Sequence, residues 1–338
     1  MKTRKKVGLK DIAKELGVST ALVSYVLNDK HPGRINQETA RRIKDLAIKL
    51  NYRPNHIAKS LKKNKTFTIG LIIADISNLF YSGIARVIED ESKNMKYNVI
   101  FGSADENPQK FQELILVFLG RQVDGLILAA PAGSEETLEY LRLQNVPFVL
   151  IDRHFPKLKD INTVLIDNHT ASYKVGEHLY NNGFRQPAMI TLKSDLFHLK
   201  ERTRGFIEAY RARNSKDPLI MEIPEEDLHS EIAGIIEEAQ KNNVDALYFS
   251  TNKIAIEGLS VLARKKIKVP EEMGVICFDE ADAYKLFPST ISFVKQPLFH
   301  IGKHAVQKLL EENSGTEQII LGAQLIKGES SVKNQSNS

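Results

Sequence analysis

Polar and aromatic side chains follow the ends of several short apolar runs in the long C-terminal part of the chain. Nine of them have the chemistry to bind a polyhydroxylated molecule: Asn78, Phe80, Tyr81, Asp152, Arg153, Arg202, Asn252, Asp279 and Gln296. Carboxylate, guanidinium and amide groups are planar and form paired hydrogen bonds with neighbouring hydroxyls. The flat faces of Phe80 and Tyr81 can pack on the apolar C–H surface of a ring. These nine residues are the candidate ligand-binding residues.

Each candidate also has a structural interpretation. Asp152 and Arg153 could form an ion pair at the end of a strand, because such pairs resemble functional sites. The two aromatic residues begin a helix and could belong to the core. Asp279 could cap a turn, and Gln296 could tie two lobes together. In a true site, a buried polar group left without its hydroxyl partner would cost about 1 to 3 kcal/mol, which rejects the wrong ligand.

The common catalytic and cofactor signatures are missing from the chain. It contains no G-x-S-x-G, G-x-x-x-x-G-K-[ST], H-E-x-x-H or G-x-G-x-x-G motif. The histidines are scattered without metal-ligand spacing, among them His154, His169, His178 and His198. The single cysteine, Cys277, supplies neither an internal disulfide nor a multi-thiolate metal site. We therefore expect a binding protein rather than an enzyme, with no cofactor and no metal.

Alternating strands and helices must position the candidate residues. Short apolar runs alternate with helical patterns from Thr66 onward, which is typical of parallel sheets covered on both faces. The predicted strands are 68–74, 98–103, 125–130, 148–152, 164–167, 188–191, 246–250, 274–278 and 291–295, and the predicted helices include 84–95, 171–182, 201–213 and 254–266. Nine strands exceed one compact lobe. We therefore expect two similar lobes that bind a ligand between them, beyond the carboxyl ends of their strands.

Three short amphipathic helices are predicted at the start of the chain. Their apolar stripes are Leu9, Ile12, Ala13 and Leu16, then Leu22, Val23, Val26 and Leu27, then Ile43, Leu46, Ala47 and Leu50. Gly17 separates the first two helices, and Ser19 and Asn36 are good N-caps for the second and third. Two helices joined in this way predict a helix-turn-helix, whose second helix enters the major groove of DNA. The outer face of that helix carries Thr20, Ala21, Ser24, Tyr25 and Asn28, of which Thr20, Ala21 and Tyr25 are expected to read bases.

The charge of the chain divides into a basic head and an acidic body. Residues 1–65 contain 17 Lys and Arg against 5 Asp and Glu, whereas the remainder contains 30 basic and 37 acidic residues. Apolar periodicity runs through the basic segment, which distinguishes it from a disordered basic tail. The head is therefore expected to bind a polyanion.

Five motifs of the head occur in a fixed order: Leu9-Lys10-Asp11-Ile12-Ala13, Gly17-Val18-Ser19, Val23-Ser24, Val26-Leu27-Asn28 and Asn51-Tyr52-Arg53-Pro54-Asn55. Together they resemble the head of the LacI/GalR family of bacterial transcription regulators. The resemblance implies that Ser19, Tyr52 and Asn55 join the DNA contacts. Tyr25 departs from the arginine common at its position, and Arg34 follows a slightly longer turn, so the operator sequence cannot be carried over from the family.

The segment Ile57-Ala58-Lys59-Ser60-Leu61 resembles the hinge helix of the same family. The resemblance adds Ile57, Ala58 and Leu61 to the DNA contacts. Leu61 falls where the family places a leucine that wedges between base pairs in the minor groove and kinks the duplex. The structural alternative is a buried helix contact, but the neighbours of Leu61 are mainly lysines, so few apolar side chains are nearby for it to pack against.

Motifs of the body also occur in family order: Asp75-Ile76-Ser77-Asn78 with Phe80-Tyr81, Val123-Asp124-Gly125, Ile151-Asp152-Arg153, Asp167-Asn168, Arg202 with Gly205-Phe206, Phe278-Asp279 and Gln296-Pro297. They resemble the type I periplasmic-binding-protein fold that forms the family's sensor. The candidate residues match positions used by ribose-type sugar-binding proteins, so the resemblance implies a monosaccharide or a close relative as ligand. Lys253 stands where the family commonly has aspartate, and Leu79 replaces a usual proline. The lysine would favour an acidic or phosphorylated sugar, or it would pair with Glu280; between these interpretations we favour a neutral sugar.

The sequence thus predicts an all-α helix-turn-helix head plus an α/β two-lobed periplasmic-binding-protein-like (type I) sensor domain. We divide the chain into a DNA-binding domain at 1–52, a hinge helix and linker at 53–65, an effector-binding and dimerisation domain at 66–330, and a polar tail at 331–338. The expected partners are palindromic operator DNA, a second copy of the chain, and a small effector such as a mono- or disaccharide or derivative. The longest apolar run, 125–133, is far shorter than the ~18 residues of a membrane span, so we expect a cytoplasmic, nucleoid-associated bacterial protein without a membrane partner.

The expected function is that of a sequence-specific transcriptional regulator, a repressor, whose operator affinity is controlled allosterically by a small effector. Two alternatives remain open. The effector could be a phosphoprotein, as in catabolite-control relatives whose motif at Asp75 to Tyr81 is similar. The chain could also be a sugar-binding protein without a regulatory role on DNA, against which the basic helix-turn-helix argues.

Overall fold

The computed structural model describes residues 7–28, 35–52, 65–213, 215–311 and 315–333. The chain divides into two compact units, the head at Met1–Thr66 and the body at Phe67–Ser338. Within the described residues, no helix combines the length and the apolar composition that crossing a membrane requires.

The described part of the head folds into helices α1 (Leu9–Leu16), α2 (Thr20–Leu27) and α3 (Gln37–Lys49). Gly17 ends α1 with a φ of 67°, a left-handed conformation that glycine adopts without strain and that turns the chain towards α2. The predicted N-caps are confirmed. The Ser19 hydroxyl accepts from the Leu22 amide at 3.1 Å, and Asn36 Oδ1 accepts from two amides in the first turn of α3.

The predicted apolar stripes of the head meet in one small core. Ile12, Val23 and Ile43, one from each helix, are fully buried. Ala13, Val26, Leu46 and Ala47 are buried with them. Because α2 uses Val23 and Val26 for packing, its opposite face is left on the surface.

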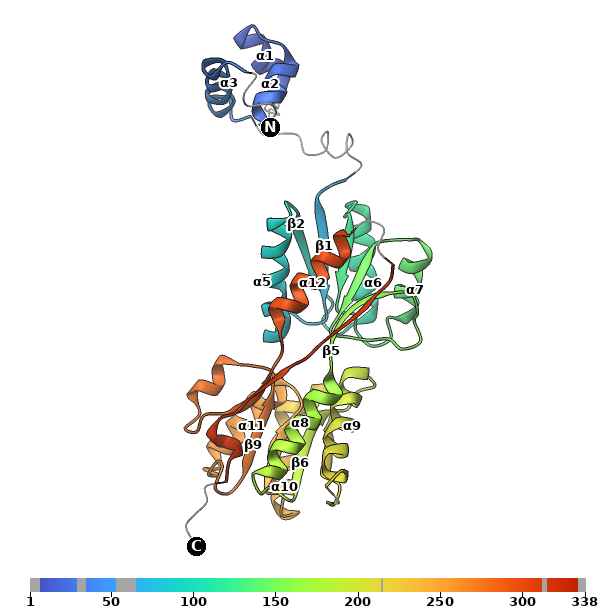
Figure 1. Ribbon diagram of the computed structural model, residues 1–338, viewed down its shortest axis with the longest axis vertical. Coiled ribbons are helices and arrows are strands. Elements are labelled where there is room, and N and C mark those ends of the chain that lie inside the picture. Colours follow the sequence, from blue (N-terminus) through green and yellow to red (C-terminus); the bar gives the residue numbers. More distant parts are fainter. Residues whose placement is uncertain (1–6, 29–34, 53–64, 214, 312–314, 334–338) are drawn as a thin grey trace. The chain divides into compact units, whose positions relative to one another are not determined.

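The first lobe of the body, within the described residues, is built on a parallel six-stranded sheet. Its strands are β1 (Thr68–Ile73), β2 (Asn98–Ser103), β3 (Gly125–Leu128), β4 (Phe148–Ile151), β5 (Asn162–Ile166) and β11 (Gln318–Leu321), in the order β11-β5-β4-β3-β1-β2. Its helices are α5 (Leu79–Asn94), α6 (Pro108–Gly120), α7 (Glu135–Leu143) and α12 (Leu298–Leu310). Helix α12 lies beside α5 although the two are far apart in sequence (Figure 1).

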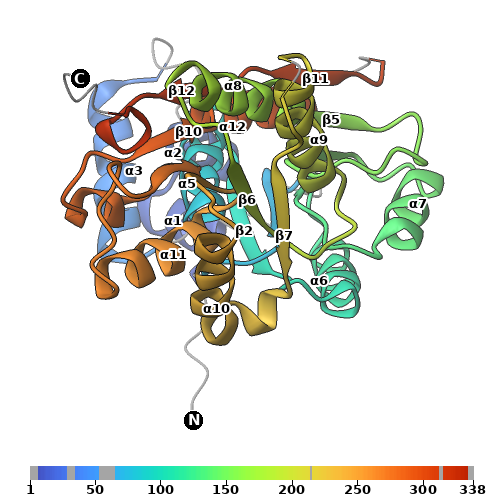
Figure 2. The same cartoon turned by 90° about the horizontal axis from the view of Figure 1, so that it is seen from below.

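The second lobe repeats this plan. Its strands are β6 (Pro187–Leu192), β7 (Leu219–Ile223), β8 (Ala246–Phe249), β9 (Gly274–Phe278), β10 (Ser292–Lys295) and β12 (Gln324–Ile326), in the order β12-β10-β9-β8-β6-β7. Strand β12 is antiparallel to β10. Helices α8 (Asn168–Asn181) and α9 (Phe197–Arg211) cover one face of the sheet, and α10 (Leu228–Lys241) and α11 (Asn252–Arg264) cover the other (Figure 2).

Strand β1 shows why the sheets are covered on both faces. Its side chains alternate, so Ile69, Leu71 and Ile73 join the core beneath α5 and α12, whereas Ile72 joins the core beneath α6 and α7. All four are essentially inaccessible to water. A strand buried on both faces reads as a continuous apolar run, as this one does.

Within the described residues, the chain crosses between the lobes after β5, after β10, and between β11 and β12 (Figure 1). The folded body also extends past the boundary predicted at residue 330. Ser331 is fully buried, and its hydroxyl lies 2.8 Å from His178 Nε2 and 2.6 Å from Ser292 Oγ. The residues as far as Lys333, whose ammonium donates to the Gly183 carbonyl at 3.0 Å, therefore belong to the second lobe.

Candidate ligand cleft and nucleic-acid interface

The residues that follow the strands of both sheets line a cleft of about 250 Å³ between the lobes. Eight of the nine candidate ligand-binding residues line it: Asn78, Phe80, Tyr81, Asp152, Arg153, Arg202, Asp279 and Gln296. The ninth, Asn252, stands between the lining residues Thr251 and Lys253 and is 2% exposed. The volume is just below the ~300 Å³ at which drug-sized sites begin, so the cleft suits a small ligand.

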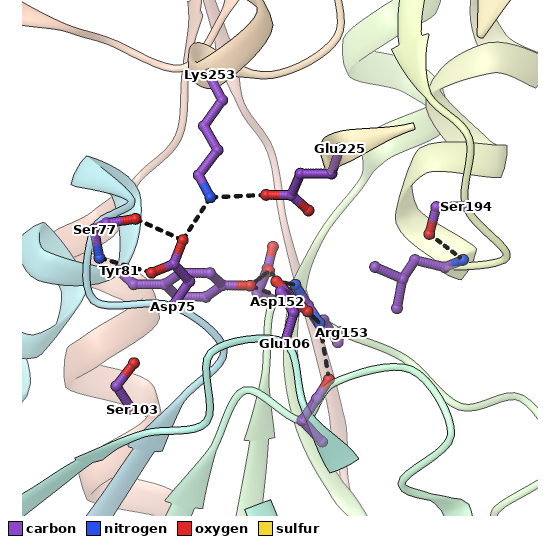
Figure 3. Close-up of polar contacts among 12 residues, drawn as sticks. Asp75, Ser77, Tyr81, Ser103, Glu106, Asp152, Arg153, Ser194, Glu225 and Lys253 are labelled. Carbon is purple, nitrogen blue, oxygen red and sulfur yellow. Dashed lines mark hydrogen bonds and ion pairs between the residues drawn. The ribbon is translucent and has the colours of Figure 1, made fainter. Parts of the chain in front are cut away.

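A hydrogen-bonded network forms the wall that the first lobe contributes (Figure 3). The Tyr81 hydroxyl donates to Asp152 Oδ2 at 2.7 Å and accepts from Arg153 Nε at 3.0 Å. Arg153 Nη1 donates to Glu106 Oε2 at 2.7 Å, whereas the Arg153–Asp152 ion pair is longer, at 3.9 Å. The main ionic partner of Arg153 is therefore Glu106, and Asp152 keeps acceptor capacity for a ligand. Burial raises the pKa of Asp152, although Arg153 opposes the rise.

The aromatic residues at the start of α5 serve both the core and the cleft. Phe80 is 6% exposed and Tyr81 is 3% exposed, and their rings meet edge to face with centroids 5.1 Å apart. Both belong to the core of the first lobe and both line the cleft. The structural and the ligand-binding interpretations are thus compatible for this pair.

Arg202, on α9, is fixed by the second lobe. Its Nε donates to Asn168 Oδ1 at 2.8 Å, and its Nη1 donates to the Ser250 carbonyl at 2.7 Å. The guanidinium carbon lies 3.4 Å from the centre of the Phe278 ring, which gives a cation–π contact. These contacts hold a positive charge at the base of the cleft in one orientation.

Asp279, the residue after β9, faces the same space. Gln296 Nε2 donates to its Oδ1 at 2.6 Å. Burial raises the pKa of Asp279 to about 6, although Arg202 and Gln296 both favour the ionised carboxylate. A ligand hydroxyl that donates to Asp279 would favour the ionised form in the same way.

Asn78 and Asn252 join the two lobes. Asn78 Oδ1 caps α5 by accepting from the Phe80 amide at 3.0 Å, and it also accepts from Asn252 Nδ2 at 2.9 Å. The side chain that begins a helix in the first lobe therefore touches the side chain that begins a helix in the second.

Three buried polar atoms around the cleft have no hydrogen-bond partner among the described residues: His198 Nδ1, Asn252 Oδ1 and Gln296 Oε1. Buried polar groups are normally paired, so these atoms point to a ligand that carries hydrogen-bond donors. Burial, with the charges of Arg202 and Arg153, lowers the pKa of His198 well below its ordinary value, so its imidazole is neutral and can accept.

Lys253 bridges the lobes at the side of the cleft (Figure 3). Its ammonium is paired with Asp75 of the first lobe and, at 2.7 Å, with Glu225 of the second. The alternative that Lys253 pairs with Glu280 is wrong, because Glu280 pairs with Lys295 at 2.8 Å. The sequence does not show the true partners, because Asp75 and Glu225 lie far from Lys253 along the chain and come close to it only in the folded body.

Other residues that line the cleft were not predicted from the sequence, among them Glu106, Lys193, Ser194, Glu225 and Glu226. His198, predicted only as one of several scattered histidines, lines it as well. Two signals could have found some of them. Glu106 follows the end of β2 just as the predicted residues follow their strands. His198 precedes Arg202 by four positions and so shares one face of α9 with it.

The described part of the chain contains no site arranged for metal binding or for thiol chemistry. No three or more His, Cys, Asp and Glu side chains there are grouped to hold a metal ion. Cys277 lies fully buried in β9, and burial raises the pKa of its thiol. A buried protonated thiol is unreactive.

The surface of α2 carries the predicted base-reading residues. Thr20, Ala21 and Tyr25 are exposed, Tyr25 to 46%. Ser19 and Asn28 are exposed as well and Ser24 is partly so, while the Asn28 amide donates to the Ser24 carbonyl at 2.8 Å. An exposed polar face on a fixed second helix is what insertion into a major groove requires.

Tyr52 differs from the other predicted DNA contacts because it packs partly buried against the core of the head. Burial raises the pKa of its hydroxyl. Asn55, Ile57, Ala58 and Leu61, and with them the predicted hinge helix at 53–65, lie outside the described residues, as does Arg34.

Two protein families match the chain. Residues 8–55 match the bacterial regulatory proteins of the lacI family, and residues 66–328 match the periplasmic binding proteins and sugar binding domain of the LacI family. The first match covers the described helices of the head, and the second covers both lobes.

Individual relatives agree over almost the whole chain. The HTH-type transcriptional regulator RegA of Clostridium saccharobutylicum is 31% identical over 96% of this chain and 99% of its own length. Catabolite control protein A of Priestia megaterium is 30% identical over 90% of this chain and 91% of its own length. Among solved structures, the Lac repressor dimer bound to operator and the anti-inducer ONPF has a TM-score of 0.84 at 18% identity, covering 97% of this chain and 100% of that one.

Proposed function

Because the chain belongs to the LacI family of bacterial regulatory proteins, we propose that a sugar bound in the cleft controls how tightly the head binds operator DNA. The protein is a DNA-binding transcriptional regulator with a sugar-binding sensor domain, and it is not an enzyme. The observation that carries the proposal is the composition of the cleft. Polar groups from both lobes converge there, so one bound ligand contacts both lobes at once.

Contact with both lobes is what lets a ligand select one arrangement of the body. A ligand shifts an equilibrium only through its different affinity for the two states. A molecule held between Asp152 of the first lobe and Arg202 of the second binds best when the lobes are closed. Strand β1 begins at Thr68, directly after the N-terminal unit that ends at Thr66, so a displacement of the first lobe reaches the segment at 53–65 that would link the lobe to the DNA-binding helices.

The nine candidate residues are the proposed effector contacts, and the effector is a monosaccharide or a molecule of similar size. Phe80 offers an aromatic surface, and the partnerless acceptors Asn252 Oδ1 and Gln296 Oε1 would each receive a ligand hydroxyl. The cleft of about 250 Å³ favours one sugar ring over two.

On the DNA side, we propose that two copies of the chain read a palindrome through α2 in adjacent major grooves, and that ligand binding lowers operator affinity as in a repressor. The proposed contacts are Ser19, Thr20, Ala21, Ser24, Tyr25, Asn28, Tyr52, Asn55, Ile57, Ala58 and Leu61. The head would end near residue 52, and 53–65 would be the linker. Such a regulator works at the chromosome, in the bacterial cytoplasm.

The test measures operator binding and ligand binding on the full-length protein. An operator is first selected from random DNA, and its affinity is then measured by fluorescence anisotropy against a panel of monosaccharides. The expected result is a change of about 5- to 150-fold with one of them, and operator DNA must change the affinity for that sugar by the same factor. A sugar that binds in calorimetry without altering operator affinity would refute the regulatory proposal. A change produced by a phosphoprotein but by no sugar would favour the protein co-effector.

Two variants on α9 locate the effector site. Arg202→Ala should abolish the response to the sugar, whereas Arg211→Ala, on the same helix but 62% exposed in its side chain, should keep it. Asn252→Ala provides a second cleft variant with less risk to folding. An unchanged response in both cleft variants would place the effector elsewhere.

A further inference from the structure

The charged side chains that line the cleft are of both signs. The carboxylates are Glu106, Asp152, Glu225, Glu226 and Asp279, and the cations are Arg153, Lys193, Arg202 and Lys253. A negatively charged ligand would need a cation that is not already neutralised, because burying an unpaired charge is costly. The partners of each cation therefore decide whether the cleft can accept an anion.

Arg153 is fully engaged within the first lobe. Its two terminal nitrogens donate to the two oxygens of Glu106, Nη1 also donates to the Ala130 carbonyl at 3.2 Å, and Nε donates to Tyr81. Four of its five N–H groups are thus used, and its side chain is only 5% exposed. A bidentate pair with Glu106 leaves little positive potential for a ligand.

Arg202 forms no ion pair with a described carboxylate, although two carboxylates lie near it. It lies close enough to Asp152 and Asp279 to stabilise the ionised form of both. Its hydrogen bonds go to Asn168 and to the Ser250 carbonyl, and its face is covered by an aromatic ring. The base of the cleft thus holds two guanidinium groups against three carboxylates.

Lys253 is shared by two carboxylates as well. Its ammonium contacts Asp75 and Glu225, and the three side chains are 29%, 14% and 39% exposed, respectively (Figure 3). The remaining cation, Lys193, is exposed at the rim, where water and salt screen its charge. Among the described residues that line the cleft, Arg153 and Lys253 are therefore paired with carboxylates, and Arg202 is held by neutral partners with two carboxylates nearby.

The buried polar atoms around the cleft that have no hydrogen-bond partner also favour an uncharged ligand with hydroxyl groups. Asn252 Oδ1 and Gln296 Oε1 can only accept hydrogen bonds, and the neutral His198 imidazole has an unpaired Nδ1. Hydroxyl groups donate to such atoms, whereas ionised phosphate and carboxylate oxygens only accept. A phosphate or carboxylate group in the cleft would therefore face an excess of carboxylates and unpaired acceptors to which it cannot donate, whereas a hydroxyl group in the same place can donate.

We infer that the cleft takes an uncharged monosaccharide and excludes the phosphorylated and carboxylated forms of the same sugar. The inference rests on the proposed function, since it concerns the ligand of the same cleft. It agrees with the neutral sugar favoured from the sequence, because Lys253 closes the side of the cleft between Asp75 and Glu225 and is not available to an anion.

The experiment titrates matched probes into the full-length protein by isothermal titration calorimetry. The probes are D-glucose, D-galactose and D-ribose with their terminal phosphates, D-glucuronate and D-galacturonate, and further neutral aldoses and ketoses with their phosphates. The expected result is saturable binding of one neutral sugar and at least 100-fold weaker binding of its charged counterpart. A phosphate or uronate that binds as tightly as the neutral sugar, or more tightly, overturns the inference and leaves the proposed function standing. If no probe of either class binds or changes operator affinity, the proposed function fails and the inference fails with it.

A double variant that removes the carboxylate partners of Lys253 tests whether their pairing causes the selectivity for an uncharged sugar. Asp75→Asn with Glu225→Gln removes both partners of Lys253, so the ratio of neutral to phosphorylated affinity should fall at least tenfold. Asp217→Asn with Glu237→Gln is the matched control, because it removes the same number of charges from surface pairs with Arg211 and Lys265. Its ratio should stay at the wild-type value. An equal ratio in the two double variants would show that neutralisation of Lys253 does not set the selectivity, and would overturn the inference.

Discussion

Asp152 and Asp279 occupy equivalent places in the two lobes. Each is the first residue after the third strand from the edge of its sheet, β4 in one lobe and β9 in the other. Both have a positive φ, of 64° and 69°, a conformation that aspartate tolerates better than most residues. The turn aims both carboxylates from opposite walls into one cleft, where both are less than a tenth exposed.

The burial of Asp279 predicts how stability depends on pH. The folded carboxyl has a pKa of about 6 and the unfolded one about 3.8, so the folded state binds more protons between these values. The contribution of Asp279 to the free energy of unfolding therefore falls as pH rises from about 4 to 6 and is constant above. Because one pKa unit is worth about 1.36 kcal/mol, the full loss is about 3 kcal/mol.

Asp279→Asn should remove this loss while keeping an acceptor for Gln296 and a residue that tolerates positive φ. Compared with wild type in urea unfolding, the variant should gain stability progressively from pH 4.5 to about pH 6, and the gain should then stay nearly constant to pH 7. Asp282→Asn, at an exposed position three residues further along the chain, should differ from wild type in free energy of unfolding by an amount that does not change with pH. A gain that is independent of pH in Asp279→Asn would mean that its carboxyl is already ionised in the folded protein at pH 4.5.

Ligand affinity should follow the same ionisation. A sugar hydroxyl donates more strongly to a carboxylate than to a carboxylic acid, so the affinity of the neutral sugar should rise between pH 5 and pH 7. Calorimetry across this range measures it, and in Asp279→Asn the rise should be lost. A wild-type affinity that falls over this range would assign the protonated form of Asp279 to the complex.

The order of the strands explains how much of the fold the sequence could predict. Strands buried on both faces, such as β1 and β9, are continuous apolar runs, and all nine predicted strands are present with ends within two residues. Strands β7, β11 and β12 were missed. They lie at the edges of the sheets, keep exposed residues such as Gln318, and contain apolar runs of only two or three residues, which are too short to be recognised as strands.

The candidate site was predictable where it depends on position after a strand. Asp152, Asp279 and Gln296 follow their strands directly, and parallel sheets place such positions at one edge. Contacts between the lobes were not predictable in this way. Lys253 and Asp75 are 178 residues apart, and their pairing depends on how two separately folded lobes face each other.

Removal of the Lys253 ammonium should weaken the contact between the two lobes. In Lys253→Met the aliphatic stem is kept and both ion pairs are lost, so amide hydrogen exchange should quicken about two- to fivefold at 76–80 and 251–255. The factor is small because the pairs are partly exposed and such pairs contribute at most about 1 kcal/mol. Lys285→Met, which breaks an exposed pair with Asp282, should leave exchange at both segments unchanged. Equal exchange in the two variants would show that Lys253 does not hold the lobes together.

Gly205 sets the distance between α8 and α9 and thereby the position of Arg202. A Cβ at Gly205 would lie 2.1 Å from the His169 carbonyl oxygen, so the helices would have to separate. Gly205→Ala should destabilise the body by about 3 kcal/mol in urea unfolding. Gly234→Ala, on α10 with no atom within 4 Å of the added Cβ, should instead stabilise it by up to about 1 kcal/mol. A loss of stability in both variants would point to the helical backbone rather than to the α8–α9 contact.

Tyr25 should contribute to the choice of DNA sequence rather than to general affinity. Tyr25 is exposed on α2, and the last turn of this helix contains no basic residue. Substitution of Tyr25 therefore removes none of the basic side chains with which the head contacts phosphates. Tyr25→Ala should weaken operator binding about 10- to 100-fold, as expected for a base contact worth roughly 1 to 3 kcal/mol, and should leave non-specific binding and the salt slope unchanged. Fluorescence anisotropy with the selected operator and with a scrambled duplex, at several salt concentrations, measures both quantities.

Tyr140→Ala, at a body position exposed to 45%, is the matched control and should bind both duplexes like wild type. If Tyr25→Ala weakens binding to both duplexes equally, Tyr25 acts on the DNA backbone and the sequence preference must come from other residues of the head.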